Sequence, residues 1–324
     1  MINQRPGYPV GGVDYPKTLG EFQKWFASES SCQEYLERIR WRDGFVCPEC
    51  GGMERWKTGR GLFRCATCQR QTSVTAGTVL EGTRKPLQMW LQALWHITSL
   101  KQGGSAMGLR QVLGLGSYQT AWTWLHKLRR AMVRPGRDRL TGEVEVDETY
   151  LGGSEHGVVG RETRNKNIVA IAVEIRGTAM GRVRLARVAD VSAASLVPFV
   201  CSAVTEGATV RTDGWWSYSG LPACGYDHRP IKISKQADPA HVVMPHVHRI
   251  ASLLKRWYLG TYQGAIRSAH LDYYLDEFTF RFNRRTSRSR GLLFYRLVEQ
   301  VLQTDSVTYR SLRGGKPCTP KHSP

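Results

Sequence analysis

The sequence predicts an α/β domain, with a mixed β-sheet flanked by helices, that follows a small cysteine ribbon and a helical region. Three observations support this prediction. The chain has 324 residues, enough for two or three domains. Two Cys-x-x-Cys pairs lie near the N-terminus, and from residue 143 onward runs typical of strands alternate with helical segments. We expect four parts: 1–80 (N-terminal helix and ribbon), 81–135 (helical region), 136–295 (α/β domain) and 296–324 (C-terminal tail).

The chain is strongly basic. It has 46 Lys and Arg against 27 Asp and Glu, which gives a formal net charge of +19. Such an excess suits a polyanion, either nucleic acid or a membrane surface, although a ribosome-associated or simply basic protein would also carry it. No apolar run approaches the roughly 18 residues that span a bilayer, and the first residues lack a signal-peptide layout. We therefore expect a nucleic-acid partner and no membrane.

The N-terminal part is expected to hold a helix over residues 17–40 and then a metal site. Two Cys-x-x-Cys knuckles are separated by fourteen residues, a spacing typical of a four-thiolate zinc ribbon. Such a closed site would be structural, because no position remains open for a substrate. The alternative is a pair of disulfides, but the other four cysteines are scattered, which favours a reducing compartment. The predicted zinc ligands are Cys47, Cys50, Cys65 and Cys68.

Residues 86–133 are expected to be helical. After a glycine break at 103–104, helices over 105–113 and 118–132 flank a short turn, which is the arrangement of a helix-turn-helix. The alternative is a three-helix packing module that makes no contact with a DNA groove. The candidate DNA contacts on the second helix of the pair are Tyr118, Gln119, Thr120, Thr123 and Lys127.

The order of elements after residue 143 predicts the fold of the largest domain. Strands are expected over 143–150, 167–175, 182–188, 208–213 and 229–233, with helices over 193–204, from 214 and from near 247. This order is that of a ribonuclease H-like domain, in which the first and fourth strands are neighbours. Asp147 and Asp213 end the first and fourth runs, so we expect them to meet, with the last helix adding a third ligand.

The third ligand is predicted to be His248, which lies 35 positions after Asp213 and seven before Lys255. Positions seven apart share a helix face, so Lys255 could reach a DNA phosphate beside the metals. Two divalent ions about 4 Å apart can support phosphodiester cleavage and joining. Asp147 would bridge both ions, Asp213 would bind one and His248 the other. Because Mg²⁺ prefers oxygen donors, a histidine ligand predicts weaker binding and a preference for Mn²⁺.

Other interpretations of these residues stay open. An aspartate at a strand end is commonly a turn or cap residue. Glu145, on the same strand face as Asp147, could be an extra ligand or a support. His241 and His246 could form a separate metal site. The arginine-rich run 281–290 could be a solvated helix end or could follow a phosphate backbone, with Arg281, Arg284 and Arg285 as the candidate contacts.

Three separated motifs, at residues 144–153, 212–218 and 274–285, together resemble bacterial insertion-sequence DDE transposases, in the subgroup with an N-terminal zinc ribbon. The resemblance covers residues from about 20 to 295. Most members of that family have Glu or Asn as the third catalytic residue, whereas Ala251 and Ser252 stand beside the motif here with no acid nearby. His248 keeps the spacing to Lys255, which matches an Asp-Asp-His-Lys variant of the family.

The resemblance implies a DNA transposase that binds terminal inverted repeats and catalyses metal-dependent strand cleavage and strand transfer into target DNA. Structural Zn²⁺, two catalytic Mg²⁺ or Mn²⁺ ions, a homo-oligomer of at least two copies on DNA and a cytoplasmic, nucleoid-associated location follow as expectations. Two alternatives remain: a catalytically inactive, transposase-derived DNA-binding regulator, and a ribonuclease H-like nuclease that cuts without joining.

Overall fold

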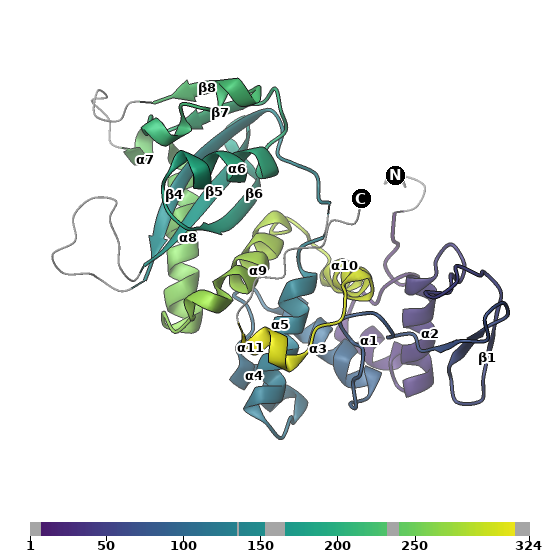
Figure 1. Cartoon of the computed structure of the whole chain (residues 1–324). Helices are drawn as coiled ribbons and strands as arrows, with labels where there is room; N and C mark the ends of the chain where they lie inside the picture. The colour runs from purple at the N-terminus through teal and green to yellow at the C-terminus, as the bar shows by residue number, and fades with distance from the viewer. Residues whose placement is uncertain (1–7, 135, 153–165, 232–239, 315–324) are drawn as a thin grey trace. The chain divides into compact units, whose positions relative to one another are not determined.

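The computed structural model describes residues 8–134, 136–152, 166–231 and 240–314, without the side chains of residues 240 and 241. These residues form two compact units. The first unit holds the described residues up to Arg134 together with Thr286–Gly314, and the second holds those between Pro135 and Arg285 (Figure 1). Within the described residues, no helix is both long and apolar enough to cross a membrane.

The first unit begins with two helices, α1 (Leu19–Trp25) and α2 (Glu29–Arg40), where the sequence predicted one. The break has a local cause. Ser28 has extended backbone angles, and its hydroxyl accepts a hydrogen bond from the backbone N–H of Ser31. Because a serine in this position caps a new helix, it ends the continuous helix that the apolar spacing suggested.

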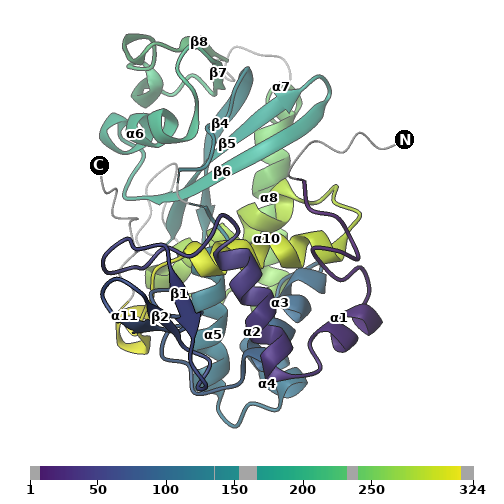
Figure 2. The same cartoon turned by 90° about the vertical axis from the view of Figure 1, so that its right-hand side faces the viewer.

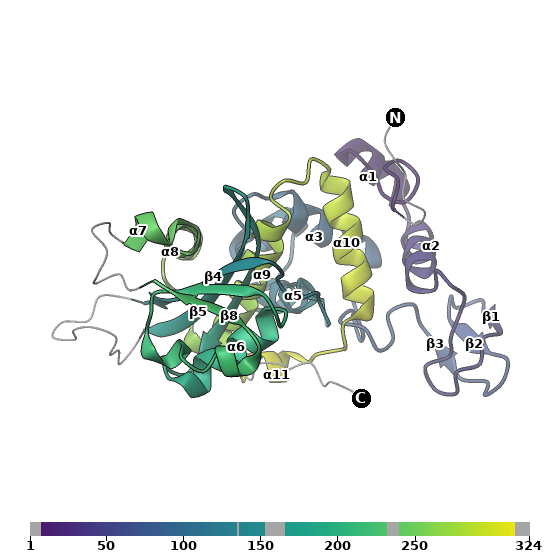
Figure 3. The same cartoon turned by 90° about the horizontal axis from the view of Figure 1, so that it is seen from above.

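The ribbon follows α2. Its three short strands, β1 (Arg55–Lys57), β2 (Phe63–Cys65) and β3 (Gln71–Thr72), pair antiparallel in the order β1-β2-β3. Figure 3 shows them gathered beyond the end of α2. A three-stranded sheet of this size has almost no apolar core of its own, so its stability depends on the cysteine site described below.

The helical region contains α3 (Leu87–Ser99), α4 (Ala106–Leu113) and α5 (Tyr118–Ala131), in agreement with the predicted helices. Serines cap the last two, and Gly114 ends α4 with φ of 61°, a left-handed conformation that glycine adopts without strain. The α4–α5 pair therefore has the helix-turn-helix connection that the sequence predicted.

One helix of the first unit extends into the predicted C-terminal tail, 296–324, and another lies within it. These are α10 (Arg290–Gln303) and α11 (Tyr309–Arg313). Residues 296–303 are thus helical and largely buried, and α10 packs against α2 and α3. The fully buried Phe294 contacts the rings of Phe22 and Trp95, each 5.6 Å away. Residues 315–324 lie outside the described part of the chain.

The second unit contains a five-stranded mixed sheet. Its strands are β4 (Glu143–Leu151), β5 (Asn167–Arg176), β6 (Ala179–Val188), β7 (Thr209–Thr212) and β8 (Asp227–Pro230), in the order β6-β5-β4-β7-β8. The first three are antiparallel, and β7 and β8 add parallel to β4. This is the ribonuclease H-like order, so the predicted fold class is confirmed, including the neighbouring first and fourth strands.

The last strand lies earlier than predicted. A strand was expected over 229–233, but β8 comprises Asp227–Pro230, and residues 232–233 are outside the described chain. A strand at the edge of the sheet does not need apolar residues, because it is exposed along one side.

Helices cover both faces of the sheet (Figure 2). One face packs against α6 (Ala193–Ala203), with Val144 and Val146 in the shared core. The other packs against α8 (Pro245–Tyr262) and α9 (Leu271–Asn283), with Leu151 in that core. Because side chains alternate along a strand, Asp147 is on the α8 face. The short elements are α7 (Ala240–Val243), η1 (Trp216–Tyr218), η2 (Pro222–Cys224) and η4 (Ser268–His270).

Candidate functional site

The two predicted catalytic aspartates are carried by neighbouring parallel strands. Glu145 of β4 pairs with Arg211 of β7, and continuing this register by two residues sets Asp147 beside Asp213. Adjacent strands lie about 4.8 Å apart, which is a suitable separation for ligands of shared metal ions. Asp147 is in the middle of β4 and Asp213 directly follows β7, so only the second of them is at a strand end.

His248 lies next to Asp147. Its Nε2 atom is 3.9 Å from Oδ2 of Asp147, and the two side chains are 31% and 14% exposed. Ligand atoms around an octahedral ion with bonds of about 2.1 Å lie about 3–4 Å apart, so the distance suits two ligands of one ion. The structure therefore brings His248 to the predicted position for a third ligand.

Lys255 is farther along the same helix, exposed and seven residues past His248. It lines a cavity of about 290 Å³ together with Lys166, Tyr150 and Tyr258. The cavity includes the end of β4 at Leu151, four residues beyond Asp147, so α8 and β4 run alongside each other in the same direction (Figure 1). Lys166 was missed by the sequence analysis, because nothing in its local sequence links it to α8.

A buried tyrosine lies against the acidic residues. Tyr218 is fully buried, and its hydroxyl donates to Oε2 of Glu148 at 3.1 Å. Burial, and then the negative charges of Glu148, Asp147 and Asp213, raise the pKa of Tyr218 well above its ordinary value. The hydroxyl therefore stays protonated and connects η1, just after Asp213, to β4, just after Asp147. This link was not predicted from the sequence.

Backbone hydrogen bonds fix the two aspartates. One oxygen of Asp147 accepts the N–H of Glu148 at 2.9 Å, and one oxygen of Asp213 accepts the N–H of Trp215 at 3.0 Å. The donor set of two carboxylates and an imidazole is of the kind that binds Mn²⁺ or Mg²⁺.

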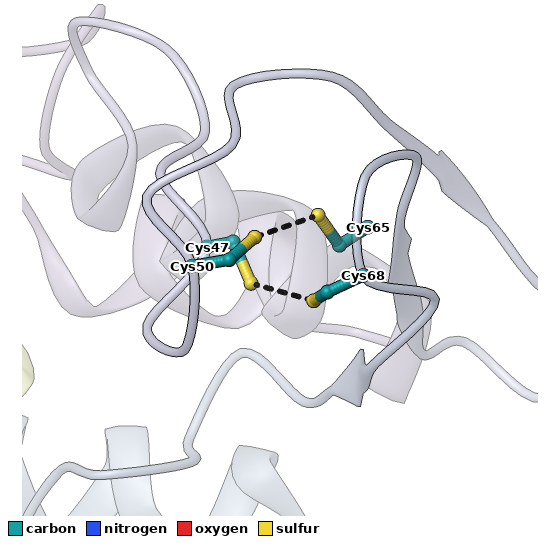
Figure 4. A group of neighbouring side chains, drawn as sticks. All are labelled: Cys47, Cys50, Cys65 and Cys68. Atoms are coloured by element: carbon teal, nitrogen blue, oxygen red, sulfur yellow. Dashed lines mark hydrogen bonds between the residues drawn. The ribbon is translucent and has the colours of Figure 1, made fainter.

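The four predicted zinc ligands converge. Their sulfur atoms all lie within 4.8 Å of one another, and they are the one group of three or more metal-ligand side chains this close among the described residues. The pairs Cys47–Cys68 and Cys50–Cys65 are 3.6 Å apart (Figure 4). A tetrahedral ion with Zn–S bonds of about 2.3 Å would hold sulfurs about 3.8 Å apart. The cluster therefore fits a four-thiolate zinc ion.

The backbone of the two Cys-x-x-Cys knuckles favours the thiolate form of Cys47 and Cys65. The backbone N–H of Cys68 is the main cause that lowers the pKa of Cys65 to about 6, and the N–H of Cys50 is the main cause that lowers the pKa of Cys47. Thiolates are the form that binds metal. All four cysteines are free of disulfides, which removes the alternative of two disulfides for this structure.

The predicted DNA contacts on α5 differ in accessibility. Tyr118 is 50% exposed and Gln119 is also exposed at the start of the helix. Thr120 is half-buried, and Thr123 is half-buried with its hydroxyl donating to the carbonyl of Gln119 at 2.7 Å. Lys127 is half-buried, and burial lowers its pKa. The first turn of α5 is therefore the part best placed for a groove.

The three predicted arginine contacts are engaged within the second unit. Arg281 is only 13% exposed and pairs with the buried Glu277 at 2.7 Å. Arg284 lies 4.2 Å from the centre of the Phe280 ring. Arg285 lies 4.0 Å from the Phe282 ring and is exposed. Their packing gives them a structural role, and Arg285 is the most accessible of the three.

The alternative prediction of a separate metal site at His241 and His246 is not supported by a third ligand among the described residues. Nδ1 of His246 is 2.9 Å from Oε1 of Glu145, and the side chain of His241 lies outside the described part of the chain. His246 therefore belongs to a contact between β4 and α8.

A ribonuclease H-like sheet with paired aspartates on its first and fourth strands, preceded by a four-cysteine ribbon, is the arrangement expected of DDE-type transposase proteins. The comparisons agree. Residues 139–283 match the model of the ISXO2-like transposase domain, and residues 27–71 match that of the transposase zinc-ribbon domain. A protein described as uncharacterized in the transposable element ISH50 of Halobacterium salinarum is 29% identical over 283 residues, which cover 80% of this chain and 92% of the relative. No solved structure matches.

In the expected order, the chain carries a transposase zinc-ribbon domain over residues 27–71 and an ISXO2-like transposase domain over residues 139–283. The resemblance predicted from the three motifs is thereby confirmed.

Proposed function

We propose that this protein is a DNA transposase that cleaves the ends of its element and joins them to target DNA. The observation that carries the proposal is that Asp147 and Asp213 continue the register of neighbouring strands in a ribonuclease H-like sheet, with Nε2 of His248 3.9 Å from Oδ2 of Asp147. The transposase domain that spans these residues supports it.

The catalytic metals would be two Mg²⁺ or Mn²⁺ ions, which activate an oxygen nucleophile and neutralise the charge that develops on phosphate. Asp147 would bind both, Asp213 one and His248 the other. These ligands need not all lie within bonding distance of one ion, which agrees with the open arrangement of the set. With one imidazole in place of a carboxylate, the site carries two formal negative charges, so Mn²⁺ is the preferred ion.

The remaining residues would hold DNA. Lys255 and Lys166, which line one cavity, would contact a phosphate near the metals. The ribbon, with a structural Zn²⁺ on its four cysteines, and the start of α5 would bind the terminal inverted repeats. Two DNA ends must be brought together for transposition, so we expect at least a dimer on DNA.

The test is strand cleavage and joining on DNA that carries the element's own ends, with wild type and Asp147→Ala compared in Mg²⁺ and in Mn²⁺. Cleavage at the 3′ ends followed by joining, lost in the variant, would establish the proposal. DNA binding without cleavage in either metal would contradict it and favour a DNA-binding regulator. Cleavage without joining would favour a nuclease.

A further inference from the structure

Glu145 is a fully buried carboxylate two residues before Asp147 on β4, with no exposed side-chain surface. Removing a carboxylate from water is costly unless hydrogen bonds compensate for it. Both of its oxygens are bonded. Oε2 accepts the backbone N–H of Val247 at 2.8 Å, and Oε1 lies 2.9 Å from Nδ1 of His246. Since an ionised carboxylate only accepts, the imidazole donates its Nδ1–H.

These bonds provide the N-terminal cap that α8 lacks in its own sequence. The residue before the helix is Met244, which has no polar side chain to cap it, and Pro245 in the first position has no N–H. A side chain at the N-cap normally accepts the third N–H of a helix. Here Glu145 accepts it from 102 positions away, and its charge also complements the positive end of the helix.

The contact between Glu145 and the start of α8 lies beside two of the proposed metal ligands. Two residues beyond Glu145 on the same face of β4 is Asp147, and two residues beyond His246 on α8 is His248, 3.9 Å from Asp147. The clamp formed by Glu145, His246 and the Val247 N–H thus lies two residues before that pair of proposed ligands on the strand, and one to two residues before it on the helix. It therefore fixes the position of α8 along β4 and the rotation of the helix about its axis, and so determines where His248 lies.

We propose that Glu145 is a positioning residue that fixes the start of α8 and thereby holds His248 opposite Asp147. This inference rests on the proposed function, because it assigns His248 to a metal ion. It also decides between the two roles open for Glu145: with both oxygens occupied, the carboxylate supports the site and is not itself a ligand.

The experiment measures Mn²⁺ binding to the full chain by electron paramagnetic resonance, beside cleavage of element-end DNA. Glu145→Gln keeps the size of the side chain but places an amide N–H₂ against one of its two donors. We expect the Mn²⁺ dissociation constant to rise roughly tenfold, as for other residues that orient a metal ligand. Glu143→Gln is the matched control: it is on the same strand, but its side chain is 41% exposed and pairs with Arg211, so Mn²⁺ binding should not change.

A double-mutant cycle tests whether Glu145 acts through His248. If it does, Glu145→Gln should have little effect on Mn²⁺ binding once His248→Ala is present, so the two effects will not add. Full additivity would overturn the proposal, and so would an unchanged Mn²⁺ affinity in Glu145→Gln.

A second pair of variants guards against simple misfolding. His246→Asn keeps an N–H donor close to the place of Nδ1, and His246→Ala removes it. We expect the asparagine to retain near wild-type Mn²⁺ binding and the alanine to weaken it several-fold, a difference that a general loss of folding would not produce; equal effects would overturn the proposal. If the wild type binds Mn²⁺ but cleaves no DNA, only the proposed function fails. If it binds no Mn²⁺, both fail.

Discussion

The two proposed metal sites of this protein are built in opposite ways. The cysteine site comes from one stretch, residues 47–68, and its ligands are set by two tight knuckles. The aspartate–histidine site combines β4, the end of β7 and the start of α8, and Asp147 and His248 are 101 positions apart in the sequence. The first is closed and gathers four ligands within 4.8 Å, whereas the second is open. A structural ion needs a complete ligand set, but a catalytic ion needs room for its substrate.

The largest effect is expected at the open site. Asp213→Asn should lower metal-dependent cleavage on the order of 1,000-fold or more, because one ion loses a charged ligand. The fold and DNA binding should stay near wild type, as the Trp215 N–H can still bond the amide oxygen. Cleavage rates in Mn²⁺ and gel-shift affinity measure the two effects. Asp227→Asn, at an exposed aspartate on β8, is the control and should keep its activity. Loss of DNA binding in Asp213→Asn would mean that this aspartate has a structural role.

At the closed site, replacing one ligand should instead disturb the fold of the ribbon and DNA binding. Cys65→Ser should reduce bound zinc from about one ion per chain and unfold the ribbon, since metal binding and folding are coupled. DNA affinity should then fall roughly tenfold or more through lost phosphate contacts. Elemental analysis measures the zinc content and gel shift measures the DNA affinity. Cys224→Ala, outside the cluster, is the control. Full zinc content in Cys65→Ser would exclude Cys65 as a ligand.

The contrast also explains what could be predicted from the sequence. The knuckles were predictable because their ligands are neighbours in the chain. Asp147 and Asp213 were predictable because the order of strands fixes which ones are adjacent. The bonds of Glu145 with α8 and of Glu148 with Tyr218 were not, since they join residues 102 and 70 positions apart through side-chain packing. Helix α10 was misplaced in a tail because its buried partners are near the N-terminus.

The packing of α10 allows the first unit to be tested without touching the ribbon. A Cβ on Gly291 would lie 1.9 Å from the carbonyl oxygen of Pro16, so Gly291→Ala requires the backbone to move. We expect it to destabilise this unit by about 3 kcal/mol, as overpacking of a core does. Gly20→Ala, in a helix with open space around it, should be neutral or stabilising by up to about 1 kcal/mol.

Hydrogen exchange of peptides from α2, α3 and α10 measures the local stability of the first unit. Faster exchange in Gly291→Ala than in Gly20→Ala is the expected result. Equal protection would show that the segment at Pro16 yields easily and that α10 does not depend on this close approach.

The smallest expected effect tests the second unit away from its proposed metal ligands. Glu174 is buried, and burial alone would raise its pKa, but hydrogen bonds and charge from Arg182 and the Thr141 N–H lower it to about 2. Because this folded-state pKa is depressed, the carboxylate stabilises the unit above its ordinary pKa of about 4.5, and the contribution is lost as the pH falls from about 5 toward 2. Glu174→Gln should therefore cost on the order of 2 kcal/mol at pH 7 and progressively less below pH 5. The exposed Glu143→Gln should change stability by less than about 1 kcal/mol at either pH. Urea unfolding at a series of pH values measures both, and a pH-independent cost for Glu174→Gln would mean that packing, and not the charge, makes this residue stabilising.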